Sequence, residues 1–308
     1  MELRSIKYFV AIAELGNISG AAIKLGIAQP ALTRHIKQLE GELNTILFNR
    51  LARGVQLTAS GREFLQYANR IIAEVAQAKH QITGQGLKPT GSIVFGASPT
   101  ISTILMPRVV SDSLHELPEI NLKLIEGRSI RLYDSLLTGL LDMAILTNPL
   151  PSYKLHLTPL ISEPLCLVGI RSALPRRRLG NLEALESIPL ILTPGMLFLM
   201  NRFQAGAKLN LKIIAEIESI ETIRSLVKAG EGITIAPSTA FFEEINKNEL
   251  HALTLDIEGL HRDLVLASRT DNAHLPGVRE LSRIVRAAVN SQMGMGLLMG
   301  VDRSTTRF

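Results

Sequence analysis

Residues 16–53 read GNISGAAIKLGIAQPALTRHIKQLEGELNTILFNRLAR, and this stretch decides the fold because two short helical patterns meet in it across one tight turn. Ser19 is a good cap for a first helix, and Gly26 supplies the left-handed position that ends it. A second helix begins at Gln29 or Pro30, where the missing N–H of proline costs nothing. Its apolar residues recur at helical spacing, which predicts a helix-turn-helix.

The face of the second helix opposite these apolar residues carries donors suited to base edges and phosphates. Residues 47–58 then read as a short strand, a glycine-containing turn with arginines, and a return strand, which together predict a wing over neighbouring phosphates. The simpler alternative is a helical hairpin whose basic residues only face water. We predict nucleic-acid contacts at Ser19, Gln29, Pro30, Ala31, Thr33, Arg34, Lys37, Gln38, Arg50 and Arg53.

The charge of the chain is concentrated in its first third. Residues 1–90 hold 11 Lys/Arg and 6 Asp/Glu, whereas the remainder holds 22 of each, so the whole net charge of +5 belongs to the N-terminal part. A basic region on a neutral body is the electrostatic footprint of a nucleic-acid binder.

A long helical pattern follows Thr58, a good cap, and continues to about Gln81. Its apolar residues fall near a heptad seam, and the sequence offers no other helix of comparable form, so we expect a second copy as partner. Packing against its own chain is the alternative. The predicted dimerisation residues are Leu65, Ala68, Ile72 and Val75. Residues 83–91 contain three glycines and a proline, which predicts a hinge.

Strand-like and helical runs alternate from Ser92 to Val289, which predicts an α/β body. Hydroxyl side chains follow several of the strands and open helices. Because ligands of open α/β sheets bind outside the carboxyl ends of strands, these hydroxyls are candidates for a small-molecule site, although each one alone also suits a helix cap. The candidates are Ser98, Thr100, Ser129, Thr147 and Thr193.

The motifs AAIKLGIAQPALTRHIKQLEGEL, LFNR and VQLTASG, with the order of elements behind them, resemble the LysR-type transcriptional regulators from residue 1 to about 290. Ala28 departs from the family by replacing the hydroxyl that usually caps the second helix, and Gly41 stands where a helix former is usual. The resemblance implies an all-α winged helix-turn-helix, a long linker helix and a two-lobed α/β effector domain like the type 2 periplasmic-binding proteins. The implied ranges are 1–58, 59–88 and 89–308, with one lobe near 92–163 and 265–290 and the other near 164–264.

The resemblance also implies partners: promoter DNA with an interrupted palindrome, a homodimer or homotetramer, a small-molecule effector of unknown identity that is anionic or hydrogen-bonding, and RNA polymerase as a further contact. Ser98, Thr100 and Ser129 match family positions that line the effector cleft.

Other classes of protein fit the sequence less well. The single Cys166 excludes an internal disulfide, and no signal peptide or bilayer-length apolar run is present, so we expect a cytoplasmic protein without membrane contact. Scattered histidines and the lack of a G-x-S-x-G elbow predict no metal, no cofactor and no catalytic activity. A solute-binding protein or an enzyme on the same two-lobed fold remains the alternative.

Overall fold

The computed structural model describes residues 1–51, 54–83, 89–176, 179–203 and 210–302. The chain forms two compact units. The first comprises Met1–Ser92 together with the short segment Glu119–Asn121, and the second comprises Ile93–Pro118 and Leu122–Phe308. Each unit has its own core and is described by itself.

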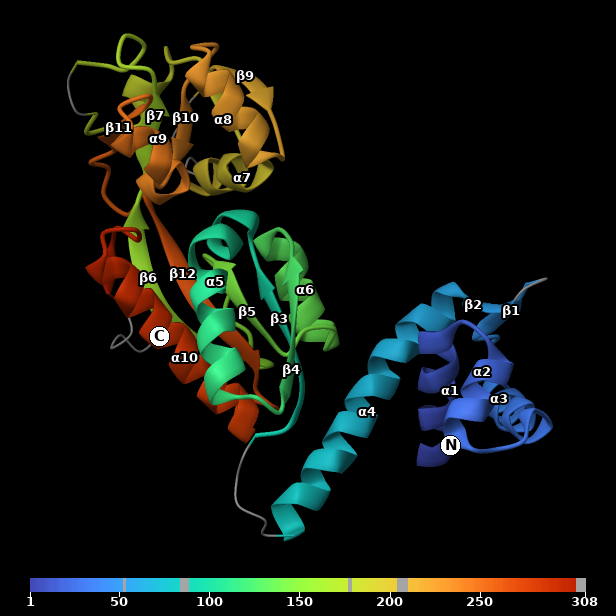
Figure 1. Ribbon diagram of the computed structural model, residues 1–308. Coiled ribbons are helices and arrows are strands. Elements are labelled where there is room, and N and C mark those ends of the chain that lie inside the picture. Colours follow the sequence, from blue (N-terminus) through green and yellow to red (C-terminus); the bar gives the residue numbers. More distant parts are fainter. Residues whose placement is uncertain (52–53, 84–88, 177–178, 204–209, 303–308) are drawn as a thin grey trace. The chain divides into compact units, whose positions relative to one another are not determined.

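The first unit begins with three helices and a two-stranded hairpin (Figure 1). Phe9, Ile12, Leu32 and Leu39 are at most 1% exposed and form the centre of its core. Leu32 and Leu39 recur at the helical spacing that the sequence shows, which confirms the apolar face of the second half of the motif. The elements are α1 (Leu3–Leu15), α2 (Ile18–Leu25), α3 (Gln29–Leu43), β1 (Phe48–Arg50), β2 (Val55–Leu57) and α4 (Ala59–Thr83).

The caps of the helix-turn-helix correct one sequence-based expectation. Asn17, not Ser19, caps α2, because the Asn17 side chain accepts a hydrogen bond from the N–H of Gly20 while Ser19 already lies inside the helix. Asparagine and serine cap almost equally well, so residue type alone does not distinguish these two neighbouring positions. Gly26 takes the left-handed conformation with φ of 65°, as predicted. Ala28 precedes α3 and makes no side-chain cap.

The long helix α4 starts where the sequence predicts. The Thr58 hydroxyl accepts a hydrogen bond from the N–H of Gly61 at 2.9 Å and donates to the carbonyl of Ile46 at 2.7 Å, so the cap also ties the helix start to the wing. The helix continues for 25 residues. Of the predicted hinge, residues 84–88 lie outside the described residues.

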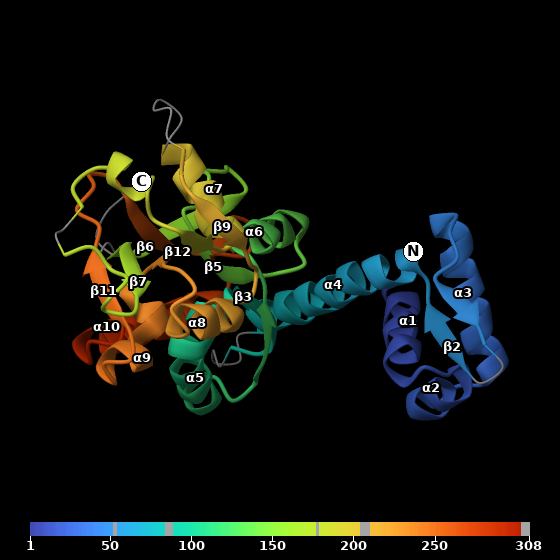
Figure 2. The ribbon, with the colours of Figure 1, turned by 90° about the horizontal axis from the view of Figure 1, so that it is seen from above.

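The second unit contains two lobes, and the first lobe is built on a six-stranded sheet in the order β13-β6-β12-β5-β3-β4. Helices α5 and α10 contact each other on one face of this sheet, and α6 covers the other face (Figure 2). Strands β3 and β5 are parallel, so their carboxyl ends meet at one edge. The elements are β3 (Gly91–Ala97), α5 (Pro99–Glu116), β4 (Ile120–Glu126), α6 (Ser129–Thr138), β5 (Met143–Thr147), β6 (Leu155–Pro164), β12 (His261–Arg269), α10 (Pro276–Gly294) and β13 (Val301–Asp302).

Two long antiparallel strands, β6 and β12, lead the chain into the second lobe and back. The pairing shifts register between Leu264 and Val265, whose partners are Ile161 and Pro159, so Leu160 is the extra residue of a bulge. A proline cannot donate to a ladder and is tolerated at such a bulge. The sequence did not predict β6, because its two prolines read as breaks.

The second lobe has two small sheets, ordered β10-β7-β11 and β8-β9, which a bridge between Leu190 and Ile233 joins. Its core includes Leu167, Leu190 and Met200, each fully buried. The elements are β7 (Cys166–Gly169), η1 (Glu183–Leu185), β8 (Leu190–Leu192), α7 (Pro194–Phe203), β9 (Ile213–Glu216), α8 (Ile220–Lys228), β10 (Thr234–Ala236), η2 (Ser238–Phe241), α9 (Phe242–Asn246) and β11 (His251–Thr254).

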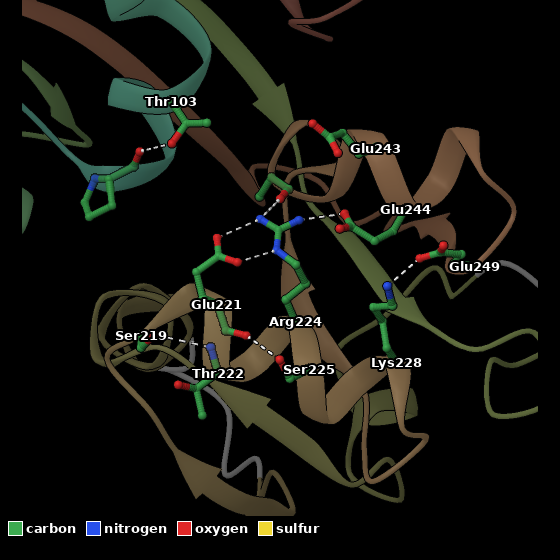
Figure 3. A network of polar contacts seen from close by, with 12 residues as sticks. Thr103, Ser219, Glu221, Thr222, Arg224, Ser225, Lys228, Glu243, Glu244 and Glu249 are labelled. Atoms are coloured by element: carbon green, nitrogen blue, oxygen red, sulfur yellow. Dashed lines mark hydrogen bonds and ion pairs between the residues drawn. The ribbon is translucent and has the colours of Figure 1, made fainter.

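A polar network fixes α8 against η2 and α9 on this lobe (Figure 3). The Arg224 guanidinium donates to the carboxylates of Glu221 and Glu244, at 3.1 and 2.6 Å, and to the carbonyl of Ala240 at 3.1 Å. It also lies over the ring of Phe241, 5.2 Å from the centroid. Because Arg224 is largely buried and fully paired, the network has a structural role and offers no free charge to a ligand.

Candidate functional site

The helix α3 presents a polar face to solvent. Its apolar side is buried in the core, whereas Arg34, Lys37 and Gln38 are exposed. Of the other predicted contact residues on this helix, Gln29 and Pro30 are exposed, and Ala31 and Thr33 are half-buried. Ser19 is exposed on α2. Gln38 donates to the carboxylate of Glu42 at 3.2 Å, while Arg34 and Lys37 have no hydrogen-bond or ion-pair partner among the described residues, which leaves both cations available.

A carboxylate on α3 holds the wing in place. Glu40 Oε1 accepts hydrogen bonds from the backbone N–H groups of Leu47 and Phe48, at 2.8 and 3.2 Å. These donors open the hairpin β1–β2, in which Phe48 pairs with Leu57 and Arg50 with Val55. Glu40 therefore fixes the wing to the helix beside it. Sequence reasoning missed this role, because an acidic residue in a basic region carries no signal for it.

The wing is the least described part of this surface. Arg50 is the last residue of β1, and Arg53 lies outside the described residues. Gly54 follows with φ of +88°, and a Cβ built on it would lie 2.4 Å from the carbonyl oxygen of Gly16. The return strand also donates from Val55 N to that oxygen at 2.8 Å. The start of the return strand is thus seated directly on the turn between α1 and α2.

The apolar seam of α4 is used in part by its own chain. Ala68 is fully buried in the core of the first unit, and Leu65 and Ile72 pack against the same core. Val75, one turn further along, is half-buried. The first part of the helix therefore packs on its own head as far as Ile72, and a partner helix has mainly the part beyond it to cover.

Four of the five predicted ligand residues lie in the first lobe at one edge of its sheet. Ser98 follows β3 and caps α5 by position, yet its hydroxyl makes no cap hydrogen bond. Ser129 opens α6, and its Oγ accepts from Thr147 N at 2.8 Å and reaches the Thr147 carbonyl at 3.3 Å. Thr100 is half-buried in the first turn of α5. Because β3 and β5 are neighbouring parallel strands, these hydroxyls gather where ligands of such sheets bind.

Thr193, the fifth predicted ligand residue, belongs to the second lobe and serves as a cap. Its Oγ1 accepts a hydrogen bond from the N–H of Met196 at 3.1 Å, at the start of α7. The Thr193 hydroxyl therefore serves as a helix cap, and its O–H donor and its second lone pair are what it can offer to a ligand.

An ion pair joins the two lobes beside these hydroxyls. Arg128 precedes Ser129, and its Nε lies 3.3 Å from Oε1 of Glu218, which follows β9 in the second lobe. The Nε atom is buried and has no hydrogen bond of good geometry, so the contact is electrostatic more than directional. A cation with an incompletely used donor at this edge of the sheet suits a carboxylate or sulfate group.

The described residues offer no other reactive centre. They contain no group of three or more His, Cys, Asp or Glu side chains that could hold a metal ion. Burial raises the pKa of the Cys166 thiol, which keeps it protonated and unreactive, and Thr254 lies 3.8 Å from its sulfur. Among the described helices, none is long and apolar enough to span a bilayer.

A basic winged helix-turn-helix joined by a long helix to a two-lobed α/β domain defines a class of protein, the ligand-responsive transcription regulators. The chain matches the family model of the bacterial regulatory helix-turn-helix proteins of the lysR family over residues 3–62, and that of the LysR substrate binding domain over residues 87–290. It belongs to the LysR family of DNA-binding transcription regulators, whose second domain binds an effector.

Similar proteins agree with this assignment. The nitrogen assimilation regulatory protein nac of Klebsiella aerogenes is 36% identical over 78% of this chain and 79% of its own length. The transcriptional regulator BbuR of Bordetella bronchiseptica is 30% identical over 94% of this chain and 91% of its own. A full-length OxyR variant of Pseudomonas aeruginosa shares the fold with a TM-score of 0.69, at 22% identity over 94% of this chain and 95% of that one.

Proposed function

We propose that this regulator acts in the cytoplasm as a homodimer or homotetramer, binds an interrupted palindrome in promoter DNA and responds to a small anionic effector held between its lobes. The proposal rests most on one observation, the gathering of Ser98, Ser129 and Thr147 at the edge of the first sheet beside the interlobe contact of Arg128 with Glu218. No catalytic step is part of it, since the related proteins are named as regulators.

The proposed DNA contacts divide into two kinds. Arg34 and Gln29 on the exposed face of α3 read bases, because bidentate donors on a helix in the major groove distinguish base pairs. Lys37, Arg50 and Arg53 contact phosphates, which adds affinity without sequence choice. Replacing Arg34 with alanine should cost about 1–3 kcal/mol at one position of the site, whereas replacing Lys37 should weaken all sequences alike.

The proposed effector competes with a carboxylate that the protein already carries. Glu218 occupies Arg128 across the lobes, so an anionic ligand that takes over Arg128 also releases the contact between the lobes. A ligand shifts the regulator only by as much as it prefers one arrangement over another, and exchange of this ion pair supplies such a preference. Thr100 and Thr193 add donors from either side.

Selection from a pool of random duplexes tests the DNA half of the proposal. The parent protein should enrich an interrupted palindrome, and the Arg34→Ala variant should relax the choice of base at one position in each half-site. Enrichment of unrelated sequences, or an unchanged palindrome with Arg34→Ala, would show that α3 does not read the site as proposed.

A thermal-shift screen of small carboxylates tests the effector half. A compound that stabilises the parent should fail to stabilise the Ser98→Ala, Ser129→Ala double variant, which should still bind DNA without ligand. Thr138→Val is the matched control, because the Thr138 hydroxyl bonds to Asp134 O within α6 at 2.9 Å and takes no part in the sheet edge. A double variant that keeps the full shift would place the effector elsewhere.

A further inference from the structure

A groove lined by polar and basic residues lies in the first lobe between α10 and the strands β6 and β12. Its volume is about 690 Å³, within the range that metabolite sites in proteins occupy.

The floor of this groove is polar where a helix-covered sheet would ordinarily be apolar. His156 and Thr158 on β6 stand opposite Ser268 and Leu266 on β12, and all four line the groove. His156 is exposed at its edge, whereas Thr158 and Ser268 are the polar residues that lie deeper. Ser268 is only 5% exposed. The hydroxyls of Thr158 and Ser268 have no hydrogen-bond partner among the described residues, which leaves both free to bind a ligand.

The rim of the groove is positively charged. Three arginines of α10 and one acid, Glu280, line it. Arg283 is neutralised, because its Nε donates to Glu280 at 2.9 Å and its guanidinium also pairs with Glu116 of α5. Arg279 and Arg286 have no acidic partner among the described residues, and the one hydrogen bond of Arg286 goes to the carbonyl of Ser282 at 3.4 Å. Two unpaired guanidinium groups therefore flank one polar hollow.

The groove is separate from the proposed effector cleft. Along β12, Leu264 pairs with Thr147 at the cleft, whereas Ser268 pairs with Met143 at the opposite end of β5. Four residues of strand span about 13 Å, so the floor of the groove lies at the other end of the sheet. A ligand in one site does not touch the residues that we assign to the other.

We propose that this groove is a second binding site, for an organic polyanion of metabolite size that carries phosphate or several carboxylate groups. Arg279 and Arg286 bind its charged groups through paired N–H donors, in the geometry that matches phosphate and carboxylate oxygens. Thr158 and Ser268 donate to its inner oxygen atoms. Apolar or cationic compounds should not bind, because the groove has a polar floor and a positively charged rim.

Calorimetric titration of the full-length protein at constant ionic strength tests the proposal, with citrate and fructose 1,6-bisphosphate as probes. The parent should bind at least one probe saturably. The Arg279→Gln, Arg286→Gln double variant should bind it at least about tenfold more weakly, since two charge-assisted hydrogen-bond partners are lost. Both arginines are exposed, so the variant should unfold at the temperature of the parent when no probe is present.

Two controls separate this site from general charge attraction and from the effector cleft. Arg171→Gln removes an exposed arginine of the second lobe and should leave the affinity unchanged, as should the Ser98→Ala, Ser129→Ala double variant. The proposal is overturned by a lack of saturable binding of both probes, by equal loss in Arg171→Gln, or by unchanged binding in the double arginine variant. A change in the sedimentation of the unliganded arginine variant would also overturn it, because the groove would then be an interface between copies.

Discussion

Glu40 is a carboxylate in the most basic part of the chain, and its Oε1 serves two backbone donors of the wing. Hydrogen bonds to a charged acceptor are stronger than neutral ones, and a donor left unpaired in a partly buried place is costly. The value of this residue therefore lies in where it places the wing. The negative charge of Glu40 is tolerated near DNA because it is directed at these backbone donors inside the protein.

We expect Glu40→Ala to destabilise the first unit by about 1–3 kcal/mol and to flatten the salt dependence of DNA affinity, because the wing arginines lose their position. Glu40→Gln keeps an acceptor oxygen and should stay close to the parent. Fluorescence anisotropy over a series of salt concentrations measures the slope, with the exposed Glu63→Ala as control. If Glu40→Ala shows the same salt dependence as the parent, Glu40 does not position the wing for DNA binding.

The buried Cys166 thiol gives a prediction about pH. Burial raises its pKa in the folded state, so the unfolded chain loses this proton at a lower pH than the folded chain does. The thiol thus contributes stability that is complete below the unfolded pKa, about 8.5, and is lost as the pH rises through the folded value. A disulfide reagent should label the native protein slowly and the urea-unfolded protein fast. The free energy of unfolding should fall above about pH 8.5, and less so in Cys166→Ala.

At the scale of elements, helices with regular apolar spacing were predicted from the sequence, whereas the strand β6, which contains prolines, was not. The helix α3 begins at the predicted Gln29, because proline at its first turn and apolar spacing agree. Pro159 and Pro164 hid β6, since only the partner strand reveals that a bulge accommodates Pro159. Pro99 lies in the first turn of α5, where a proline is tolerated although it resembles a break in the sequence.

The hydroxyl residues of the candidate site were predictable from their type and from their position after strands. The residues that contact the site from distant parts of the chain were not. Ser98, Ser129 and Thr147 were found because hydroxyls after strands are a local signal. Arg128 contacts Glu218, and Glu40 accepts hydrogen bonds from the wing. Both contacts join separate elements of the chain, so the spacing of residues in the sequence does not predict them.

The helix α4 gives a prediction about assembly. Because Ala68 is already buried in its own head, a partner helix should pack beyond it, and Val75→Glu should dissociate the oligomer by leaving a desolvated charge in the interface. Asn69→Glu, at an exposed position of the same helix, is the matched control. Sedimentation velocity measures the outcome. An unchanged sedimentation coefficient in Val75→Glu would mean that this part of the helix serves its own chain only.

At the scale of the whole molecule, a buried ion pair ties the lobes together where the two long strands cross between them. Glu163 is fully buried at the end of β6, accepts from Arg262 Nε of β12 at 2.8 Å, and accepts from Thr239 Oγ1 of the second lobe at 2.6 Å. The three groups satisfy one another, so the junction is held by polar contacts and not by an apolar seam.

We expect Glu163→Gln to lower the free energy of unfolding by about 3–5 kcal/mol, because the Arg262 charge stays buried without its partner. Hydrogen exchange should show faster opening at the ends of β6 and β12 in particular. Glu231→Gln, an exposed acid of the second lobe, is the control. Equal protection of these strands in variant and parent would mean that the ion pair does not hold the junction.

The register of β6 and β12 has a further consequence. Pro164 and His261 are direct partners at the end of the ladder, although the whole second lobe lies between them in sequence. The second lobe is therefore an insertion at the tip of the β6–β12 hairpin. A short turn joining these two residues would leave every other pairing of the first sheet intact. The same junction could receive a foreign domain, so the second lobe can be exchanged while the first sheet, which carries four of the five proposed effector residues, keeps its strand pairings.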